Sequence, residues 1–474
     1  MEDEFDGDSI EPLEVDMEAD DDSGGDKDKK KSMESAEGTA KSEPNVYLPG
    51  RKLEDDEELV HDSTAYHMYH SAQSGDPCLS FDILKDTLGM NRTEYPMTCY
   101  LVGGTQSGRL KDSLLVIKMH NLQRTSKERN EDDDDDDAES DSDESIDGEQ
   151  PEMETVMIEH HRSVNRVRCS AVNGRHLVAT WSASSDVYVW DIATQIAAVD
   201  NPVDQPAKPV GSKSKKRNER VHPVFTFSGH SEEGFAIDWS TTVAGRLATG
   251  DCNSNIHIWQ PDDNATWHVD QRPYKAHSAS VEDIQWSPNE ASVFASCSVD
   301  KTVRIWDIRP SPSKACMLTT EAHDSDVNVI SWNKNDHYII SGGDDGIVKV
   351  WDLRKFQSGE SVAMFKHHSG PITSLEWHPT DSSVFGASGE DNQISLWDLA
   401  VEKDNVNPDT KDLDVPPQLL FVHMGQEDIK EIHWHPQIPG VMISNRRDHQ
   451  YASGSGLLTI ILNESRLGRC VTVL

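Results

Sequence analysis

The chain has 474 residues, 35% hydrophobic residues and a formal net charge of −41, a charge that disfavours direct binding to nucleic acid or an anionic membrane and favours a basic protein partner. Seven cysteines without a CxxC spacing indicate neither a disulfide framework nor a thiolate zinc site. The start, MEDEFDGD, is unlike a secretory signal. The sequence has no run of 18 apolar residues, so we expect no membrane span. We therefore expect a reducing compartment, cytosol or nucleus.

Residues 1–44 are predicted to form a disordered acidic tail, because the first 22 residues hold 12 acidic side chains and no basic one. Order is expected from about residue 45. The spacing of Ala65, Tyr69 and Ala72 predicts a helix within 54–74, capped by Asp62 or Ser63 and ended by Gly75. Its apolar face would pack on the rest of the fold.

Two apolar runs, MTCYLVGG (97–104) and LLVIKMHNL (114–122), predict a pair of strands before the repeats that follow. We expect residues 45–122, helix and strands together, to close a ring whose last blade is supplied by both chain ends. Such closure would remove exposed sheet edges.

Residues 123–155 are predicted to be a disordered acidic insertion, since 131–149 hold 13 acidic residues and no basic one. The segment is either a solvated spacer or a partner-binding element fixed on the rim of the fold. Serines among the acids suit an acid-directed kinase, which would deepen the charge. The candidate binding residues are Glu131, Asp132, Asp133, Asp134, Asp135, Asp136, Asp137, Glu139, Asp141, Asp143 and Glu144, and the candidate phosphorylation sites are Ser140, Ser142 and Ser145.

From 156 to 462 the chain repeats a unit that opens with His and closes with Trp-Asp about 29 residues later, with alternating apolar residues between. Ten of the twelve tryptophans fall on two positions of this repeat. The best copy, 276–307, predicts strands around Val281–Trp286, Val293–Ala295 and Val303–Trp306, which is most of a four-stranded propeller blade. The repeats therefore predict an all-β propeller.

One repeat carries a full set of residues for a buried hydrogen-bonded network, in which His donates to a hydroxyl and the hydroxyl to Asp. That predicted structural tetrad is His277, Ser298, Asp300 and Trp306. In two other repeats Gly343 and Gly389 stand where the serine is expected. These residues are interpreted as core, not as catalytic groups.

Two further insertions interrupt the repeats, at 193–222 and at 401–418. The first contains Lys213, Lys215, Lys216 and Arg217, a cluster that is either a nuclear import signal or solvated surface charge. After Ser444 the pattern becomes irregular. We expect LLTIIL (457–462) to be the last inner strand, without a closing Trp-Asp, and 463–474 to be an irregular tail.

The sequence contains no GxxxxGK[ST], GxSxG, HExxH or GxGxxG motif. His433 and His435 form a possible metal pair, but a repeat-end motif before Pro436 explains them better. We expect no catalytic residue, no cofactor and no metal, and so a protein that is not an enzyme.

Several segments, some of them outside the repeats, resemble a known family. VYLPGRKL, PCLSFDILKD, MNRTEYPMTCYLVGGTQ, VIKMHNL, VNRVR and FVHMGQEDIKEIHWHPQIPGVMIS are similar to the glutamate-rich WD-repeat proteins, over about Val46 to Ser444. That family belongs with the histone-binding WD-repeat proteins of chromatin-assembly complexes. Two departures stand out: the acidic run of this chain is Asp-rich, and the end after Ser444 lacks the family's short closing strand.

The resemblance implies a seven-bladed WD-repeat β-propeller with an N-terminal helix, a nuclear and nucleolar location, and work in large ribosomal subunit assembly on pre-ribosomal particles. It implies core histones and a basic large-subunit ribosomal protein as partners. The family's helix before the propeller forms part of a histone-binding groove; it matches Asp62–Gln73, so Tyr66, Tyr69 and His70 are the candidate partner-binding residues there.

A second function stays open. Trp306–Arg309 and Trp351–Arg354 both fit the WDxR pattern of substrate receptors on cullin-RING ubiquitin ligases. Arg309 and Arg354 would then contact the ligase adaptor, or they are ordinary surface charge.

Overall fold

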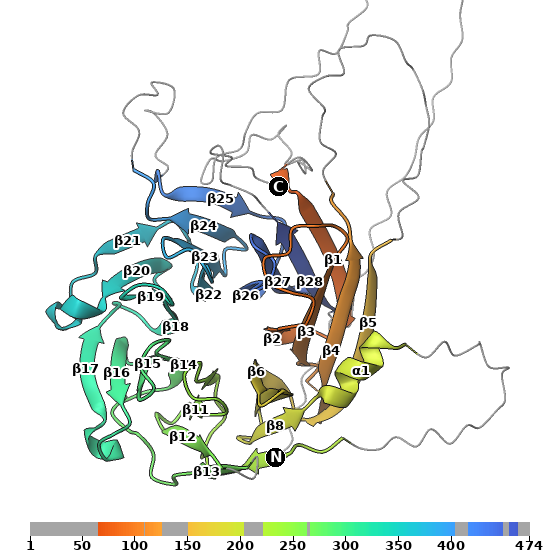
Figure 1. Ribbon diagram of the computed structural model, residues 1–474. Helices are drawn as coiled ribbons and strands as arrows, with labels where there is room; N and C mark the ends of the chain where they lie inside the picture. The colour runs from red at the N-terminus through yellow and green to blue at the C-terminus, as the bar shows by residue number, and fades with distance from the viewer. Residues whose placement is uncertain are drawn as a thin grey trace, which may run out of the picture. The chain divides into compact units, whose positions relative to one another are not determined.

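The repeat pattern produces a closed ring of seven four-stranded antiparallel sheets around one axis (Figure 1). The computed structural model describes residues 65–108, 110–125, 150–202, 221–262, 266–402, 416–448 and 455–462. The predicted all-β, seven-bladed propeller is confirmed.

Each blade runs from an innermost strand at the axis to an outermost strand at the rim. Blade 1 is β2 (Cys78–Leu84), β3 (Met97–Thr105), β4 (Lys111–Leu122) and β5 (Glu152–His161). Blade 2 is β6 (Val164–Val172), β7 (Arg175–Ser182), β8 (Val187–Asp191) and β9 (Phe225–Phe227). Blade 3 is β10 (Ala236–Trp239), β11 (Leu247–Gly250), β12 (Ile256–Pro261) and β13 (Trp267–Val269). Blade 4 is β14 (Val281–Trp286), β15 (Val293–Ser298), β16 (Thr302–Asp307) and β17 (Cys316–Glu321).

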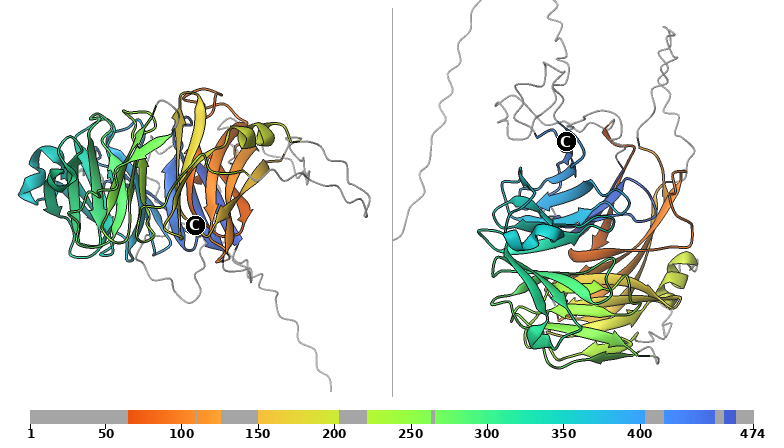
Figure 2. Two further views of the ribbon diagram at one scale, coloured as in Figure 1. Left: turned by 90° about the horizontal axis from the view of Figure 1, so that it is seen from below. Right: turned by 60° about the vertical axis from the view of Figure 1, so that its left-hand side comes forward.

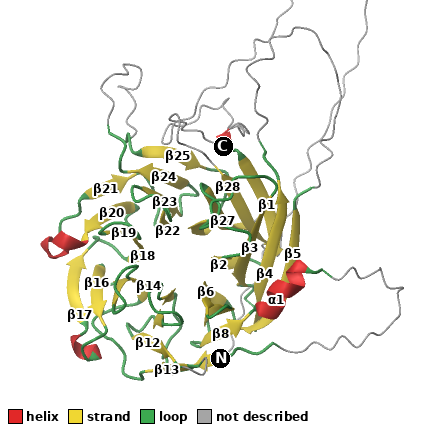
Figure 3. Ribbon diagram, viewed as in Figure 1, coloured by secondary structure: helices red, strands yellow, loops and turns green. Residues whose placement is uncertain are grey.

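Blade 5 is β18 (Val327–Trp332), β19 (Tyr338–Gly343), β20 (Ile347–Asp352) and β21 (Ala363–Lys366). Blade 6 is β22 (Ile372–Trp377), β23 (Val384–Gly389), β24 (Ile394–Asp398) and β25 (Leu419–His423). Blade 7 is β26 (Ile429–Trp434), β27 (Val441–Asp448), β28 (Ser455–Leu462) and β1 (Met68–Gly75). The described helical segments are α1 (Ala193–Asp200), η2 (Pro312–Lys314) and η3 (Leu353–Ser358), which Figure 3 colours red. None of them is long and apolar enough to cross a bilayer.

The core lies between neighbouring blades. One cluster joins Ile258 of blade 3 to Ile284, Phe294 and Trp306 of blade 4, and the other clusters are built in the same way. Packing is tight where blades 1 and 2 meet: a Cβ on Gly104 would lie 2.3 Å from Val164 Cγ1. The alternating apolar residues of the repeat therefore fill interfaces that exist only in the closed ring.

The predicted tetrad exists, but its hydroxyl comes from Ser296, not Ser298. Trp306 Nε1 donates to Ser296 Oγ at 2.8 Å, and Ser296 Oγ lies 2.7 Å from His277 Nε2. His277 Nδ1 lies 2.9 Å from the Asp300 carboxylate. Burial lowers the pKa of His277, so the ring is neutral, donates from Nδ1 to Asp300 and accepts at Nε2 from Ser296. The hydroxyl thus donates to histidine, the reverse of the expected direction.

Three other repeats hold equally complete networks. Their hydroxyls stand ten residues before the closing tryptophan in two repeats and on the tryptophan's own strand in the third, so Gly343 and Gly389 do not occupy the hydroxyl position. The sets are His230, Thr249, Asp251 and Trp259; His323, Ser341, Asp345 and Trp351; and His368, Ser395, Asp391 and Trp397. The expectation of a single full set is therefore wrong.

Replacing Ser296 with Ala should destabilise the fold by roughly 2 kcal/mol or more, since Trp306 Nε1 and His277 Nε2 both lose their buried partner. Ser298→Ala is the matched control on the same strand. It removes a weaker bond, Ser298 Oγ to Ala279 O at 3.3 Å, and one from the Asp300 amide. Urea unfolding of the two variants measures the difference. A larger loss in Ser298→Ala would contradict the assignment of Ser296 to the network.

Blade 7 is built from both ends of the described chain, as predicted, but its N-terminal strand comes from residues that were expected to form a helix. Residues 68–75 form β1, which pairs in antiparallel register with β28 from Met68 opposite Leu462 to Gly75 opposite Gly456. The expected helix over Asp62–Gln73 is therefore wrong from Met68 onwards, and 54–64 lie outside the described residues. Figure 2 shows the N-terminal strands in orange beside the C-terminal strands in blue.

Two further expectations change. The pair 97–104 and 114–122 does not supply the shared blade, because it forms β3 and β4 inside a complete blade 1. The predicted acidic insertion also ends earlier, since β5 begins at Glu152. LLTIIL lies within β28, the third strand from the axis, with β1 outside it, and is not an inner strand.

Strand direction sets the face on which the insertions attach. The first and third strands of each blade run the same way, so the connections after β4, β8 and β24 lie on the face where the innermost strands end. Three long inter-strand segments, 123–151, 192–224 and 399–418, are therefore anchored on one face of the ring. The described ends of the predicted insertions therefore lie at this face.

Candidate protein-interaction site

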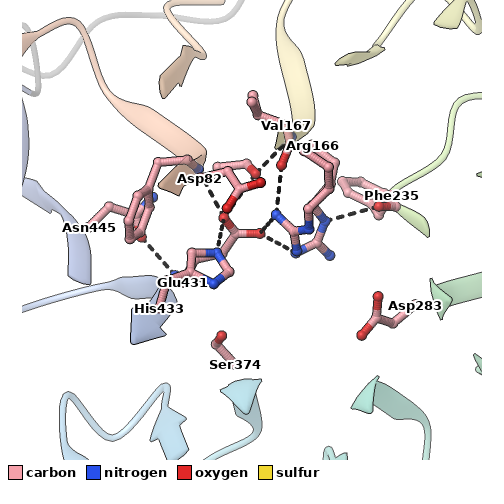
Figure 4. Close-up of polar contacts among 12 residues, drawn as sticks. Asp82, Arg166, Val167, Phe235, Asp283, Ser374, Glu431, His433 and Asn445 are labelled. Carbon is pink, nitrogen blue, oxygen red and sulfur yellow. Dashed lines mark hydrogen bonds and ion pairs between the residues drawn. The ribbon is translucent and has the colours of Figure 1, made fainter. Parts of the chain in front are cut away.

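The inner strands carry a buried charge cluster centred on Glu431 of β26, whose side chain is 2% exposed (Figure 4). Its carboxylate accepts from Ser80 Oγ and the Phe81 amide, both at 2.9 Å, and pairs with Arg166 and Arg168 of β6. The cluster therefore joins blades 7, 1 and 2 at the axis.

His433 extends the cluster to blade 6. Its Nδ1 lies 3.2 Å from Glu376 and its Nε2 3.5 Å from Glu431. Burial alone lowers the pKa of His433, but the two carboxylates overcome this and raise the pKa to about 9. Burial opposes ionisation of Glu431 too, yet Arg168 and Arg166 hold its pKa well below the usual range. At neutral pH the cluster is thus a network of compensated charges.

Beside the cluster a cavity of about 390 Å³ opens where the inner strands end, lined by charges of both signs that include Asp82, Arg168, Asp238 and Lys334. Its carboxylates accept backbone amides of the next blade: Asp82 accepts from Cys169, and Asp238 accepts from Trp286. Burial raises the pKa of Asp238 to about 7. The carboxylates of Asp82 and Asp238 therefore already hold neighbouring blades together through hydrogen bonds. We interpret them as structural groups.

The outer seam between blades 7 and 1 is a better candidate site. Tyr66, 1% exposed, lies just before β1 on the opposite side of blade 7, against β25 of blade 6. Gln426 donates its side-chain amide to His423 Nε2 at 2.8 Å, so His423 Nδ1 donates to the Tyr66 hydroxyl at 2.7 Å, and the Tyr66 ring packs edge-on against Phe421. His423 stands at the repeat's histidine position, but in this blade it meets Tyr66 and Gln426 instead of a serine and a tryptophan. Tyr66 is therefore buried among these side chains, and its role in partner binding stays a prediction.

Tyr69 and His70 lie half-buried on β1, against the segment that leads into the acidic insertion. The Tyr69 amide donates to Thr125 Oγ1 at 2.9 Å, and His70 Nε2 lies 2.8 Å from the Gln123 carbonyl oxygen. The Thr125 amide donates to the His67 carbonyl. On the other side, Asn121 donates its side-chain amide to the Gln150 carbonyl. The start of the N-terminal strand and both ends of the insertion therefore meet at one seam.

Sequence reasoning missed Gln123 and Thr125 at this seam, and His423 between blades 6 and 7. His423 could have been found, because it falls on the histidine position of the repeat. Gln123 and Thr125 contribute through a backbone carbonyl and a hydroxyl group, and no sequence motif predicts such contacts. The outermost strand beside them, β5, begins with Glu152 and carries Glu154 two residues further on. These glutamates add fixed negative charge next to the seam.

The remaining predicted sites divide into two groups. The acidic residues 131–144, Ser140, Ser142 and Ser145, and the basic cluster at Lys213–Arg217 lie outside the described residues. Arg309 and Arg354 are described, and their side chains are 73% and 61% exposed. Arg309 forms a bidentate ion pair with Asp307, and Arg354 forms one with Asp352. In each pair the guanidinium group lowers the pKa of the aspartate below its usual value.

Comparisons with known proteins bear on this seam directly. The family of the histone-binding protein RBBP4 and its counterpart in the CAF1 complex matches residues 56–123, which include β1 to β4. The WD domain, G-beta repeat, matches 269–307, 314–352 and 359–398.

Whole-chain relatives match over most of their length. The chain is 43% identical over 449 residues to Protein HEAT STRESS TOLERANT DWD 1 of Arabidopsis thaliana, covering 89% of this chain and 94% of the relative. It is 42% identical over 452 residues to Ribosome assembly protein rrb1 of Schizosaccharomyces pombe, covering 92% and 89%. It is 44% identical over 410 residues to Glutamate-rich WD repeat-containing protein 1 of Dictyostelium discoideum, covering 84% and 81%. With this identity over this length, the chain belongs to the glutamate-rich WD-repeat protein family.

Proposed function

We propose that this protein is a non-enzymatic acidic chaperone for basic nuclear proteins, acting in large ribosomal subunit assembly and in histone binding. The family match at the β1–β4 region and the relative named for ribosome assembly support this proposal. The partners would be core histones and a basic large-subunit ribosomal protein, within or on the way to pre-ribosomal particles. The work would be done in the nucleus and nucleolus, with Lys213, Lys215, Lys216 and Arg217 directing import.

The observation that carries the proposal is the convergence at the seam. Thr125 and Gln150, which flank 13 acidic residues, lie against β1 and β4 in the region that the histone-binding family matches. A basic client would be attracted by the acidic run and then meet Tyr69, His70 and the β5 glutamates as fixed contacts. Phosphorylation of Ser140, Ser142 and Ser145 would strengthen the attraction.

Electrostatics set how such a site would behave. Attraction between opposite charges raises the association rate, and it falls with salt because the Debye length is about 8 Å at physiological ionic strength. A basic protein free of nucleic acid would be screened from other polyanions while bound. The chaperone role thus depends on the acidic run being close to the contact surface.

Replacing Asp132 to Asp137 with Ser should weaken binding of a purified core histone tetramer on the order of tenfold at low salt, with a smaller loss at high salt. The folding transition should not change, because these residues lie outside the described blades. Added RNA should strip the histone from the variant more readily. Fluorescence anisotropy across a salt series measures each effect.

A matched control removes the same charge elsewhere, by replacing Glu14, Asp16, Glu18, Asp20, Asp21 and Asp22 with Ser. This variant should bind nearly as well as the wild type if position matters. Equal losses in the two variants would reduce the effect to net charge. An unchanged affinity and salt dependence in the Asp132–Asp137 variant would leave the acidic run as a spacer.

A second candidate function, substrate receptor of a cullin-RING ligase, is favoured by one observation. Arg309 and Arg354 follow the third strand of neighbouring blades, are exposed, and are held by Asp307 and Asp352. Two exposed guanidinium groups at equivalent places in adjacent blades suit a partner that reads both. A double change to Ala should abolish adaptor binding and leave histone binding intact. Adaptor binding that survives the double change would exclude Arg309 and Arg354 as the contact, and a wild-type protein that does not bind the adaptor would exclude this function.

A further inference from the structure

Three side chains able to ligate a metal ion gather on blade 1 at the root of the acidic insertion. His120 of β4 lies directly opposite Glu152 of β5, and Glu154 lies two residues further along β5, opposite Lys118. Residues two apart on a strand point to the same face of the sheet, so all three side chains share one face. Antiparallel pairing therefore builds the cluster from two neighbouring strands.

The ligating atoms are close enough to share an ion. One atom from each of His120, Glu152 and Glu154 lies within 4.8 Å of the others, and His120 Nε2 is 3.5 Å from Glu152 Oε2. The side chains of His120 and Glu152 are 28% and 57% exposed. These exposed side chains can therefore shift by about an ångström or less to reach zinc–ligand distances of about 2.0–2.2 Å. Water also has access to the site and can complete the coordination.

The cation that would otherwise neutralise the cluster is bound elsewhere. Lys118, the cross-strand partner of Glu154, places its ammonium 3.0 Å from Asp200 at the end of α1 and 5.7 Å from the centre of the Tyr100 ring. Among the described residues, Glu154 makes no side-chain hydrogen bond or ion pair. The face thus holds two carboxylates and an imidazole without a fixed positive charge beside Glu154.

We propose that His120, Glu152 and Glu154 bind a divalent transition-metal ion, with Zn²⁺ as the ion of choice. A site with one imidazole and two carboxylates suits Zn²⁺, whereas Ca²⁺ and Mg²⁺ prefer six or more oxygen ligands. The ion would tie β4 to β5 where the chain leaves and re-enters the blade. It would thereby fix the direction in which the acidic insertion departs from the seam.

The test is isothermal titration of the full chain, stripped of metal with a chelator, with zinc chloride in the presence of excess Ca²⁺. We expect one saturable Zn²⁺ site and an increase in melting temperature on binding. His120→Ala and Glu154→Gln should each weaken the affinity about tenfold or more and remove the thermal shift. His161→Ala, an exposed histidine on the same β5 strand, is the control and should bind as the wild type does.

The acidic run could itself hold Zn²⁺ loosely, so the Asp132–Asp137 to Ser variant is titrated as well. Retention of the Zn²⁺ site there supports a site on β4 and β5. Wild-type affinity in His120→Ala, or loss of the site in the six-Ser variant, would overturn the proposal. These zinc titrations contain no histone. Their outcome therefore tests the metal site independently of the proposed chaperone function.

Discussion

Deletion of residues 65–75 should prevent the protein from folding to a stable monomer. This segment supplies β1, the fourth strand of blade 7, and its loss would expose the full edge of β28. Met68 and Tyr66 are buried, and Tyr66 is hydrogen-bonded to His423 of the neighbouring blade 6. An unpaired edge beside an opened apolar seam favours aggregation. Size-exclusion chromatography and circular dichroism should show aggregated or unfolded material.

A graded pair of variants separates the strand from the tail that precedes it. Deletion of 1–44 removes most of the preceding tail and should leave the melting temperature unchanged, because the described blades begin later. Tyr66→Phe keeps the ring packing and removes only the hydroxyl on His423, so it should cost about 1–3 kcal/mol. A 65–75 deletion that melts like the wild type would disprove the closure of the ring by β1.

The repeat is readable from sequence because its determinants are local and recur. Each strand predicted within 276–307 lies near its observed bounds, since the alternation around Val281, Val293 and Val303 is imposed by burial on both sides of a blade. The predicted tetrad hydroxyl is wrong by two residues. Ser296 and Ser298 both lie on β15 facing the same side, so alternation alone does not distinguish them.

The helix predicted for the N-terminal strand is wrong for a different reason. Ala65, Tyr69 and Ala72 have helical spacing, but in the structure Met68 and Ala72 pack on one core cluster and Tyr69 packs on the other, as side chains on the two faces of a strand do. The choice between helix and strand is made by β28, which lies near the other end of the described chain. The outer edge of β28 is open to one more strand of blade 7, and residues 68–75 pair with it. Tertiary pairing outweighs local propensity in this segment. The same separation along the chain explains why no local pattern predicts the contacts of Tyr69 and His70 with the root of the acidic insertion.

Glu431→Gln should destabilise the protein by about 3–5 kcal/mol, the cost of breaking a buried ion pair and leaving its partners uncompensated. Arg166, Arg168 and His433 would then share the axis without the carboxylate that joins them. The amide keeps an acceptor for Ser80 and Phe81, so the loss reports charge more than shape. Glu321→Gln, at an exposed position on β17, is the matched control and should be within about 0.5 kcal/mol of wild type.

The same variant has a pH signature that separates charge from packing. The pKa of His433 is about 9 in the folded protein against an ordinary 6.5, so its protonation stabilises the fold fully below pH 6.5 and is lost as the pH rises to about 9. Without the Glu431 charge the folded pKa of His433 should fall, and this alkaline loss should shrink and end at lower pH. Denaturant unfolding across the window from pH 6.5 to about 9 measures the slope. A variant that keeps both the wild-type stability and the wild-type alkaline slope would show that Glu431 does not hold the charged cluster together.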